Sequence, residues 1–198
     1  MPTRMPNNRR SESDGKRESG FSLLELVVAA TILTVGLLAV ASAIGYALVA
    51  SNHGRAVTNT KLLVVSILEQ METLRNTGNL SFGQIANVGQ VVNDGAARSF
   101  VGFQTGFQQI STNPGPDGIF GTSDDLIDAG SDGIFGNADD FINPNFAILG
   151  YTREIQIIPL SPTLKKIKVT VSYPVNGTMK QLVAACYLND NSQSNFVP

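Results

Sequence analysis

The chain has 198 residues, enough for one ordinary domain with attachments, and a formal net charge of −2. It has no basic patch, so the composition does not indicate nucleic acid as a partner. With one His and one Cys, the sequence offers no Ser-His-Asp and no H-E-x-x-H arrangement, which argues against an enzyme. The single cysteine, Cys186, also excludes an intramolecular disulfide.

Residues 1–20 are polar and are predicted to form a disordered leader. They carry five Lys/Arg against three Asp/Glu, whereas the remainder carries nine against thirteen. This basic excess before an apolar segment predicts a cytoplasmic N-terminus, with everything after about Ser51 outside the cytoplasm. A secretory signal peptide is cut after its apolar region, but here the small residue Gly20 precedes it. The apolar helix is therefore expected to be kept.

Residues 21–50 form an apolar run in which Glu25 is the single charged residue. About 20 apolar residues cross a bilayer as a helix, so this run predicts a transmembrane helix. A carboxylate near the start of such a segment is costly and suggests a function. Small residues such as Gly36, Ser42 and Gly45 would let neighbouring helices approach closely.

The stretch Gly20-Phe21-Ser22-Leu23-Leu24-Glu25, with the apolar run behind it, resembles the N-terminal processing signal of type IV pilins and of type II secretion pseudopilins. The resemblance implies a prepilin peptidase that cuts after Gly20 and methylates the new amine on Phe21. It also implies that Glu25 pairs with the N-terminal amine of a neighbouring subunit and sets the register of assembly. Two plainer interpretations are an ordinary signal anchor and a Glu25 that is solvated at the membrane boundary.

The same resemblance implies a fold, partners and a location. The expected fold class is α+β, with a long N-terminal helix packed on a small antiparallel β-sheet. The expected partners are other pilin or pseudopilin subunits, the prepilin peptidase, the pilus assembly platform and the membrane. The protein is expected in the inner membrane, single-pass with a cytoplasmic N-terminus, and then in a periplasmic or cell-surface filament.

Residues 51–77 are predicted to continue the helix as an amphipathic segment of the globular domain. One apolar face recurs at spacings of three and four residues: Thr60, Val64, Ile67, Met71 and Leu74. Gly78 follows the last residues of this face, at the position where a glycine commonly ends a helix. The stretch from Leu68 to Arg75 resembles minor pilins and the I-type pseudopilin more than major pilins. Residues 78–113 form a poorly patterned, variable region, in which Arg98–Phe103 is the best candidate for a strand.

Residues 114–143 hold an internal repeat. The stretch 115–127 is matched by 130–142, and each copy has three aspartates, several glycines and an Ile-Phe pair. Oxygen ligands on a flexible, glycine-rich loop suit Ca²⁺ better than Zn²⁺ or Mg²⁺. The candidate ligands are seven aspartates: Asp117, Asp124, Asp125, Asp128, Asp132, Asp139 and Asp140.

The repeat lacks the D-x-D-x-D-G pattern and the final Glu of an EF-hand, and it resembles the Asp/Gly calcium loops of extracellular bacterial proteins. The alternative is a hydrated loop built from Asx turns. We hypothesise that Ca²⁺ orders this loop in place of the missing disulfide. Each Ile-Phe pair is expected to pin its loop to the core.

The C-terminal part predicts an antiparallel meander over 146–158, 164–173 and 179–188. Alternate residues of the middle strand are apolar, from Ile167 to Tyr173, and should face the helix. Asn176-Gly177 is a strong hairpin signal. Cys186 lies in the last strand and is expected to be a core residue, and 189–198 to be a tail.

Three functions are compatible with these features. The leading one is a structural subunit of a type IV pilus-type filament, similar to a minor pilin. The second is a pseudopilin of a type II secretion system. The third, from another class, is a membrane-anchored calcium-binding adhesin or sensor.

Overall fold

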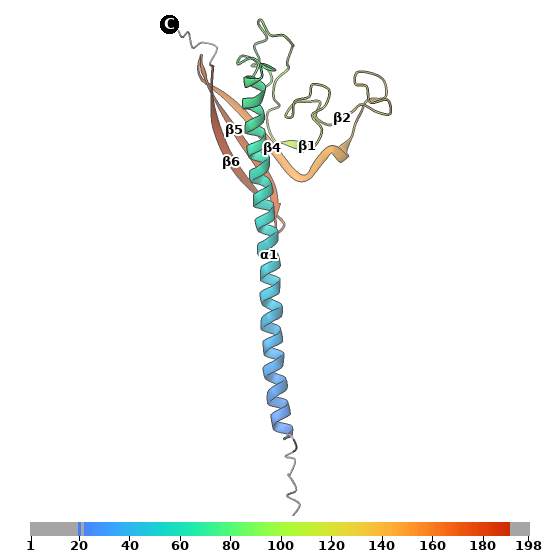
Figure 1. Cartoon of the computed structure of the whole chain (residues 1–198), viewed down its shortest axis with the longest axis vertical. Coiled ribbons are helices and arrows are strands. Elements are labelled where there is room, and N and C mark those ends of the chain that lie inside the picture. The colour runs from blue at the N-terminus through green and yellow to red at the C-terminus, as the bar shows by residue number, and fades with distance from the viewer. Residues whose placement is uncertain (1–19, 21, 191–198) are drawn as a thin grey trace, which may run out of the picture. The chain divides into compact units, whose positions relative to one another are not determined.

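The structure is a computed structural model that describes Gly20 and residues 22–190. Helix α1 (Leu23–Asn76) comes first, and six strands follow (Figure 1). Four of them form an antiparallel sheet in the order β1-β4-β5-β6, and β2 pairs with β3 in a separate hairpin. The remaining bounds are β1 Gln108–Ser111, β2 Ile127–Asp128, β3 Phe141–Ile142, the 3-10 helix η1 Pro144–Phe146, β4 Ala147–Ser161, β5 Leu164–Val175 and β6 Thr178–Asn189.

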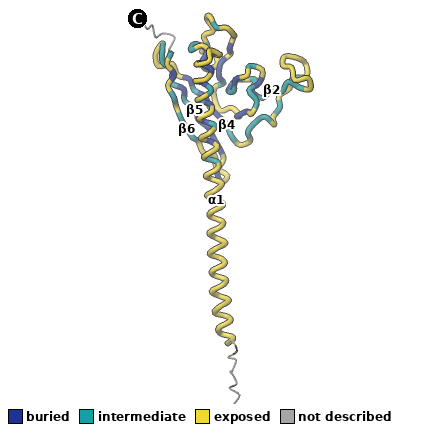
Figure 2. The backbone as a smooth tube through the Cα atoms, viewed as in Figure 1, coloured by how far each residue is buried: buried dark blue, intermediate teal, exposed yellow. Residues whose placement is uncertain are grey.

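The described residues divide into two compact units, one ending at Leu48 and one beginning at Val49. In the first unit, every described residue is exposed (yellow in Figure 2), including large apolar side chains such as Leu24 and Ile32. The helix to which this segment belongs is long and apolar enough to cross a membrane. Its hydroxyls bond to carbonyls one turn back: Thr31 to Val28, Thr34 to Ala30 and Ser42 to Leu38, at 2.7–2.9 Å. These side chains can therefore enter lipid without an unsatisfied donor.

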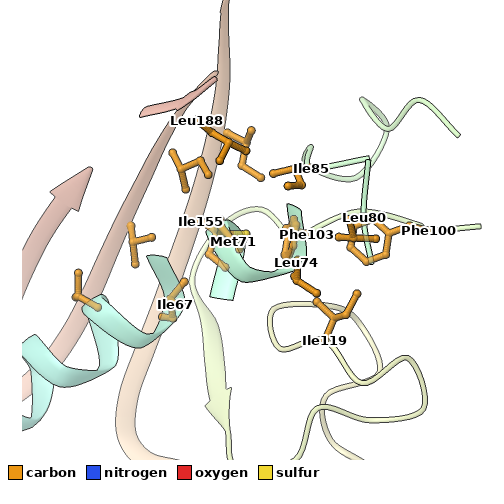
Figure 3. Packing of buried hydrophobic residues seen from close by; sticks show 14 of the residues in the cluster. Ile67, Met71, Leu74, Leu80, Ile85, Phe100, Phe103, Ile119, Ile155 and Leu188 are labelled. Carbon is orange, nitrogen blue, oxygen red and sulfur yellow. The ribbon is translucent and has the colours of Figure 1, made fainter. Parts of the chain in front are cut away.

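The second unit has a core between the later turns of α1 and one face of the four-stranded sheet (Figure 3). The predicted helix face is confirmed, because Thr60, Val64, Ile67, Met71 and Leu74 are all buried. The sheet contributes Ile155 and Ile157 from β4 and three fully buried side chains from β5, namely Ile167, Val169 and Val171. Burying a side chain of this kind stabilises the fold by roughly 1.5–3 kcal/mol. The predicted α+β fold class, with a long helix packed on an antiparallel sheet, is confirmed.

Helix α1 ends where the sequence predicts. Gly78 adopts a left-handed φ of 73°, and the Leu80 N–H donates to the Leu74 carbonyl at 3.0 Å, which closes the helix end.

The meander is also confirmed, with strands longer than predicted by up to three residues at an end. Asn176 and Gly177 have φ of 49° and 77°, which matches a two-residue type I′ turn between β5 and β6. From that turn the two strands pair without a register shift as far as Leu164 and Asn189. Cys186 is half-buried and packs against the core, and burial raises the pKa of its thiol.

The predicted strand over Arg98–Phe103 is wrong. Phe103 forms only an isolated bridge with Asn87, and Gly102 takes a left-handed φ of 114° that breaks an extended segment. Buried side-chain amides hold this region instead. Asn87 donates to the Phe103 and Ile155 carbonyls and accepts from the Ile157 N–H.

Gln84 and Asn93 extend this amide network. The Gln84 amide donates to Asn93 at 2.9 Å and to the Arg98 carbonyl at 2.6 Å. Asn93 in turn bonds to both the N–H and the carbonyl of Phe100. The network fixes Phe100 beside Phe103, and their rings pack edge to face with centroids 5.2 Å apart.

Candidate functional site

The N-terminal motif lies at the start of α1. Gly20 is exposed, and a side chain built on it would meet nothing within 4 Å. Phe21, the residue predicted to carry the new amine, lies outside the described residues. The Ser22 carbonyl accepts from the N–H groups of Glu25 and Leu26 at 3.0 and 3.1 Å, which begins the helix. Glu25 stands in the first turn, where the helix dipole favours a carboxylate. Cleavage after Gly20 and the role of Glu25 stay predictions.

The two Asp/Gly stretches fold into loops with the same backbone. We call residues 115–127 the first loop and residues 130–142 the second loop. Gly115 and Gly130 have φ of 67° and 66°, and a Cβ at either would lie within 2.7 Å of the aspartate nine residues on. The other glycine pairs agree within 9° in φ, at 72° and 70° for Gly118 and Gly133 and at 105° and 96° for Gly121 and Gly136. The repetition in sequence is thus a repetition in structure.

The first and last aspartates of the two loops make equivalent hydrogen bonds to the loop backbone, whereas the middle ones differ. Asp124 accepts from the Asp117 N–H and the Thr122 hydroxyl, and Asp139 accepts from the Ser131 N–H and hydroxyl. The first aspartate accepts from the isoleucine N–H two residues on, at 2.7 Å for Asp117 and 2.8 Å for Asp132. The last accepts from the glycine N–H four residues back, at 2.9 Å for Asp125 and 2.7 Å for Asp140. The Asx turns that the sequence suggested as an alternative are therefore present, and they shape the loops through backbone donors.

The two loops differ at their last aspartate. In the first loop, Asp125 pairs with the Arg153 guanidinium of β4, and the exposed fractions of the two side chains are 6% and 4%. Burial lowers the pKa of Arg153, and the adjacent carboxylate opposes that shift. In the second loop, Oδ1 of Asp140 is shielded from solvent and has no hydrogen-bond partner among the described residues. Asp125 of the first loop is therefore neutralised by an arginine, whereas one carboxylate oxygen of the equivalent Asp140 has no partner among the described residues.

The loops differ also in their Ile-Phe pairs. Ile119 of the first loop is buried in the core, and the Phe120 carbonyl accepts from the Gln70 amide of α1 at 2.8 Å. Ile134 and Phe135 of the second loop are exposed by 63% and 39%. The prediction that both pairs pin their loops to the core is thus correct for the first loop and wrong for the second, which the hairpin of β2 and β3 carries away from the core (Figure 2).

The predicted calcium ligands do not gather around one point. Within the described residues, no three Asp, Glu, His or Cys side chains form a group that could hold one metal ion. Asp128 lies between the loops and accepts from the Gly130 N–H and the Asn143 amide. Burial, with the charge of Asp124 adding to it, raises the pKa of Asp117 to about 6. The Ser131 N–H lowers the pKa of Asp139. Calcium binding stays a prediction.

Comparison with known proteins finds one match, to a family model of a short N-terminal motif. Residues 15–41 match the prokaryotic N-terminal methylation motif. The match spans the predicted cleavage site and the first turns of α1, and it confirms the resemblance to prepilin-type processing signals over these residues. No curated protein and no solved structure matches the chain.

Proposed function

We propose that the protein is a structural subunit of a type IV pilus-type filament, similar to a minor pilin, which is processed after Gly20 and assembled through its N-terminal helix. The observation that carries the proposal is the methylation motif at residues 15–41, which includes the first turns of an exposed apolar helix. The α+β fold of the second unit, with a helix packed on an antiparallel sheet, supports it further.

The motif has a direct physical role in this function. Cleavage after Gly20 would leave a free amine on Phe21, four residues before the Glu25 carboxylate. An ionised carboxylate in an apolar surrounding needs a partner of opposite charge. Within a bundle of such helices, the amine of a neighbouring copy comes level with Glu25 when that copy is shifted along the axis by four residues, roughly 6 Å. Glu25 would then select the relative position in which two helices associate.

The processing step can be tested on protein from native cells. Mass spectrometry should find a mature chain that begins at Phe21 with a methylated amine. A chain that still begins at Met1 would refute the proposal and favour a membrane-anchored adhesin or sensor.

The role of Glu25 can be tested with the variant Glu25→Ala. It should be cleaved normally but enter filaments poorly. Glu69→Ala is the matched control, because it removes another exposed carboxylate of α1 and should leave incorporation unchanged. Normal incorporation of Glu25→Ala would contradict the pairing role.

The type of filament follows from where the mature chain is found. Sheared extracellular fibres that contain it would favour a pilus. Confinement to the envelope, together with a secretion defect on deletion, would favour a type II secretion pseudopilin, which is the second candidate.

We further propose that a calcium ion binds the second loop rather than the first. In the first loop the Arg153 guanidinium already neutralises Asp125, whereas the equivalent Asp140 keeps one oxygen without a partner among the described residues. Asp132 and Asp139 are further carboxylates of the same loop, but they are not grouped with Asp140 in the structure, so the loop would have to rearrange to bring them to one ion. Water would complete the ligand shell, because Ca²⁺ takes six to eight oxygens. An exported site of this kind binds weakly, with a Kd of roughly 10⁻⁴–10⁻³ M.

Calcium binding can be measured on the full chain in detergent by thermal unfolding with CaCl₂ or with EDTA. At about 100 times the Kd, calcium should add roughly 2.7 kcal/mol to the stability of the structure that binds it. Hydrogen exchange should show that the protection falls on residues 130–142. Asp140→Asn should abolish the effect. Identical melting and exchange in CaCl₂ and EDTA would end this proposal.

A further inference from the structure

The second loop exposes an apolar pair that has no counterpart on the surface of the first loop. We call Ile134 and Phe135, which are 63% and 39% exposed, the second-loop knob. The strand residues beside it are open too, since Phe141 and Ile142 of β3 are 51% and 72% exposed. Exposed apolar side chains that cluster on one loop mark a contact site more often than single exposed apolar side chains do.

The first loop shows what an Ile-Phe pair on this backbone packs against. There Ile119 is 2% exposed within the core that α1 contributes to, and the carbonyl of Phe120 bonds to Gln70 of α1. The glycine dihedral angles agree within 9°, and the first aspartate of each loop accepts from the isoleucine N–H, so the Gly-Ile-Phe turn of the second-loop knob has a shape similar to that of the first loop. It is therefore preformed to pack beside a surface of this kind.

Such a surface is open beside the first loop. A cavity of about 390 Å³ lies between α1 and the first loop, and we call it the α1 groove. Its apolar walls come from Leu63, Ile67, Ile110 and Phe120. Arg153 also lines the groove, but its charge is neutralised by Asp125, so the groove suits an apolar occupant. The volume lies toward the small end of the roughly 300–1,000 Å³ typical of ligand sites, which suits one or two side chains.

We propose that the second-loop knob of one copy docks into the α1 groove of a second copy. The knob and the groove are different surfaces, so the contact is heterologous, and each copy would offer a free groove to one neighbour and a free knob to another. Contacts of this type build open chains unless the rotation closes a ring. The inference rests on the proposed function, in which copies associate in one filament. A contact this small holds only together with the helix contacts, which supply a high effective concentration.

Cysteine cross-linking of the full chain in native membranes tests the contact. Ile134→Cys on the knob is combined with Ser66→Cys at the groove, in a Cys186→Ser background. Oxidation should give a ladder of multimers on non-reducing gels. Membranes that contain the two single variants together should give mixed dimers but no ladder, because each chain then has one reactive end. Leu149→Cys, at an 86% exposed site of β4, replaces Ile134→Cys in the control pair and should give no ladder.

Sequencing the mature N-terminus in the same samples distinguishes a failure of the knob-in-groove contact from a failure of the proposed function. An absent ladder, while the chain is cleaved at Gly20 and present in filaments, overturns the knob-in-groove contact alone. An uncleaved chain that still gives the ladder removes the filament function and keeps the contact.

A second measurement avoids cysteine chemistry. Phe135→Ser should lower incorporation into filaments at least tenfold without loss of the folded chain, because the side chain packs against no core. Leu149→Ser is its matched control and should incorporate normally. Equal incorporation of both variants would overturn the contact.

Discussion

The buried pair of Arg153 and Asp125 makes a quantitative test of how the first loop is fixed to the sheet. Arg153→Met would leave Asp125 buried without a cation. Removing one partner of a buried pair costs roughly 3–5 kcal/mol. Asp125 keeps the N–H donors of Gly121 and Thr122 at 2.9–3.1 Å, so we expect the lower end, about 3 kcal/mol.

The double variant decides whether the cost comes from the unpaired charge. Arg153→Met combined with Asp125→Leu removes both charges, and apolar replacement of a buried pair is often neutral. We expect the double variant to recover most of the 3 kcal/mol, although Leu gives up the bonds to the backbone. Asp140→Asn, at the equivalent position of the second loop, is the control and should cost less than about 0.5 kcal/mol in the absence of calcium.

Thermal unfolding of the full chain in detergent, followed by circular dichroism, provides the assay. For a domain of this size, about 3 kcal/mol corresponds to a fall in Tm of roughly 6–12 °C. A single variant that melts with the native chain would refute the reasoning. So would a double variant whose loss equals the sum of the two single losses, because the pair would then have no coupling.

Three further predictions use the same assay. Gly115→Ala places a Cβ 2.2 Å from the Asp124 carbonyl oxygen and should open the first loop, whereas Gly118→Ala meets nothing within 4 Å and should cost only the left-handed strain, about 1–2 kcal/mol. Asp117 has a folded pKa of about 6 against 3.8, so the native state binds more protons and stability should fall as pH rises between those values. This pKa shift corresponds to a stability change of about 3 kcal/mol for a fully shielded group, and we expect about 1 kcal/mol because Asp117 is half-buried. Asp117→Asn keeps the bond to Ile119 and should remove this dependence of stability on pH. Met71→Ala in the core should cost about 3 kcal/mol, and Leu62→Ala, 64% exposed on the same helix, less than about 0.5 kcal/mol.

Periodicity predicted the parts of the fold that depend on one element at a time. The spacing from Thr60 to Leu74 repeats the helical turn, so the buried face of α1 could be deduced. The alternation of β5 and the Asn176-Gly177 turn similarly predicted the meander. The predicted strand over Arg98–Phe103 failed because side-chain amides 7 to 16 residues earlier in the chain, not a strand partner, bond to its backbone.

The loops were only half predictable, because their sequences are alike and their surroundings are not. The repeat gave the common backbone and the aspartates. Arg153 is the residue whose sequence position indicates the difference. Arg153 shares its parity on β4 with Ile155 and Ile157, so it faces the core, and a charge there requires an acidic partner. That partner could be in only one of the two loops, which leaves the other free.

The amide network around Asn87 has a consequence for how this protein matures. Many small exported domains depend on oxidised cysteines, and so on an oxidant in the compartment where they fold. Here the irregular stretch before β1 is tied to β4 by carboxamide groups that neither reductants nor chelators affect. The globular part outside the second loop should therefore reach its native state in a reducing cytoplasm as readily as across the membrane.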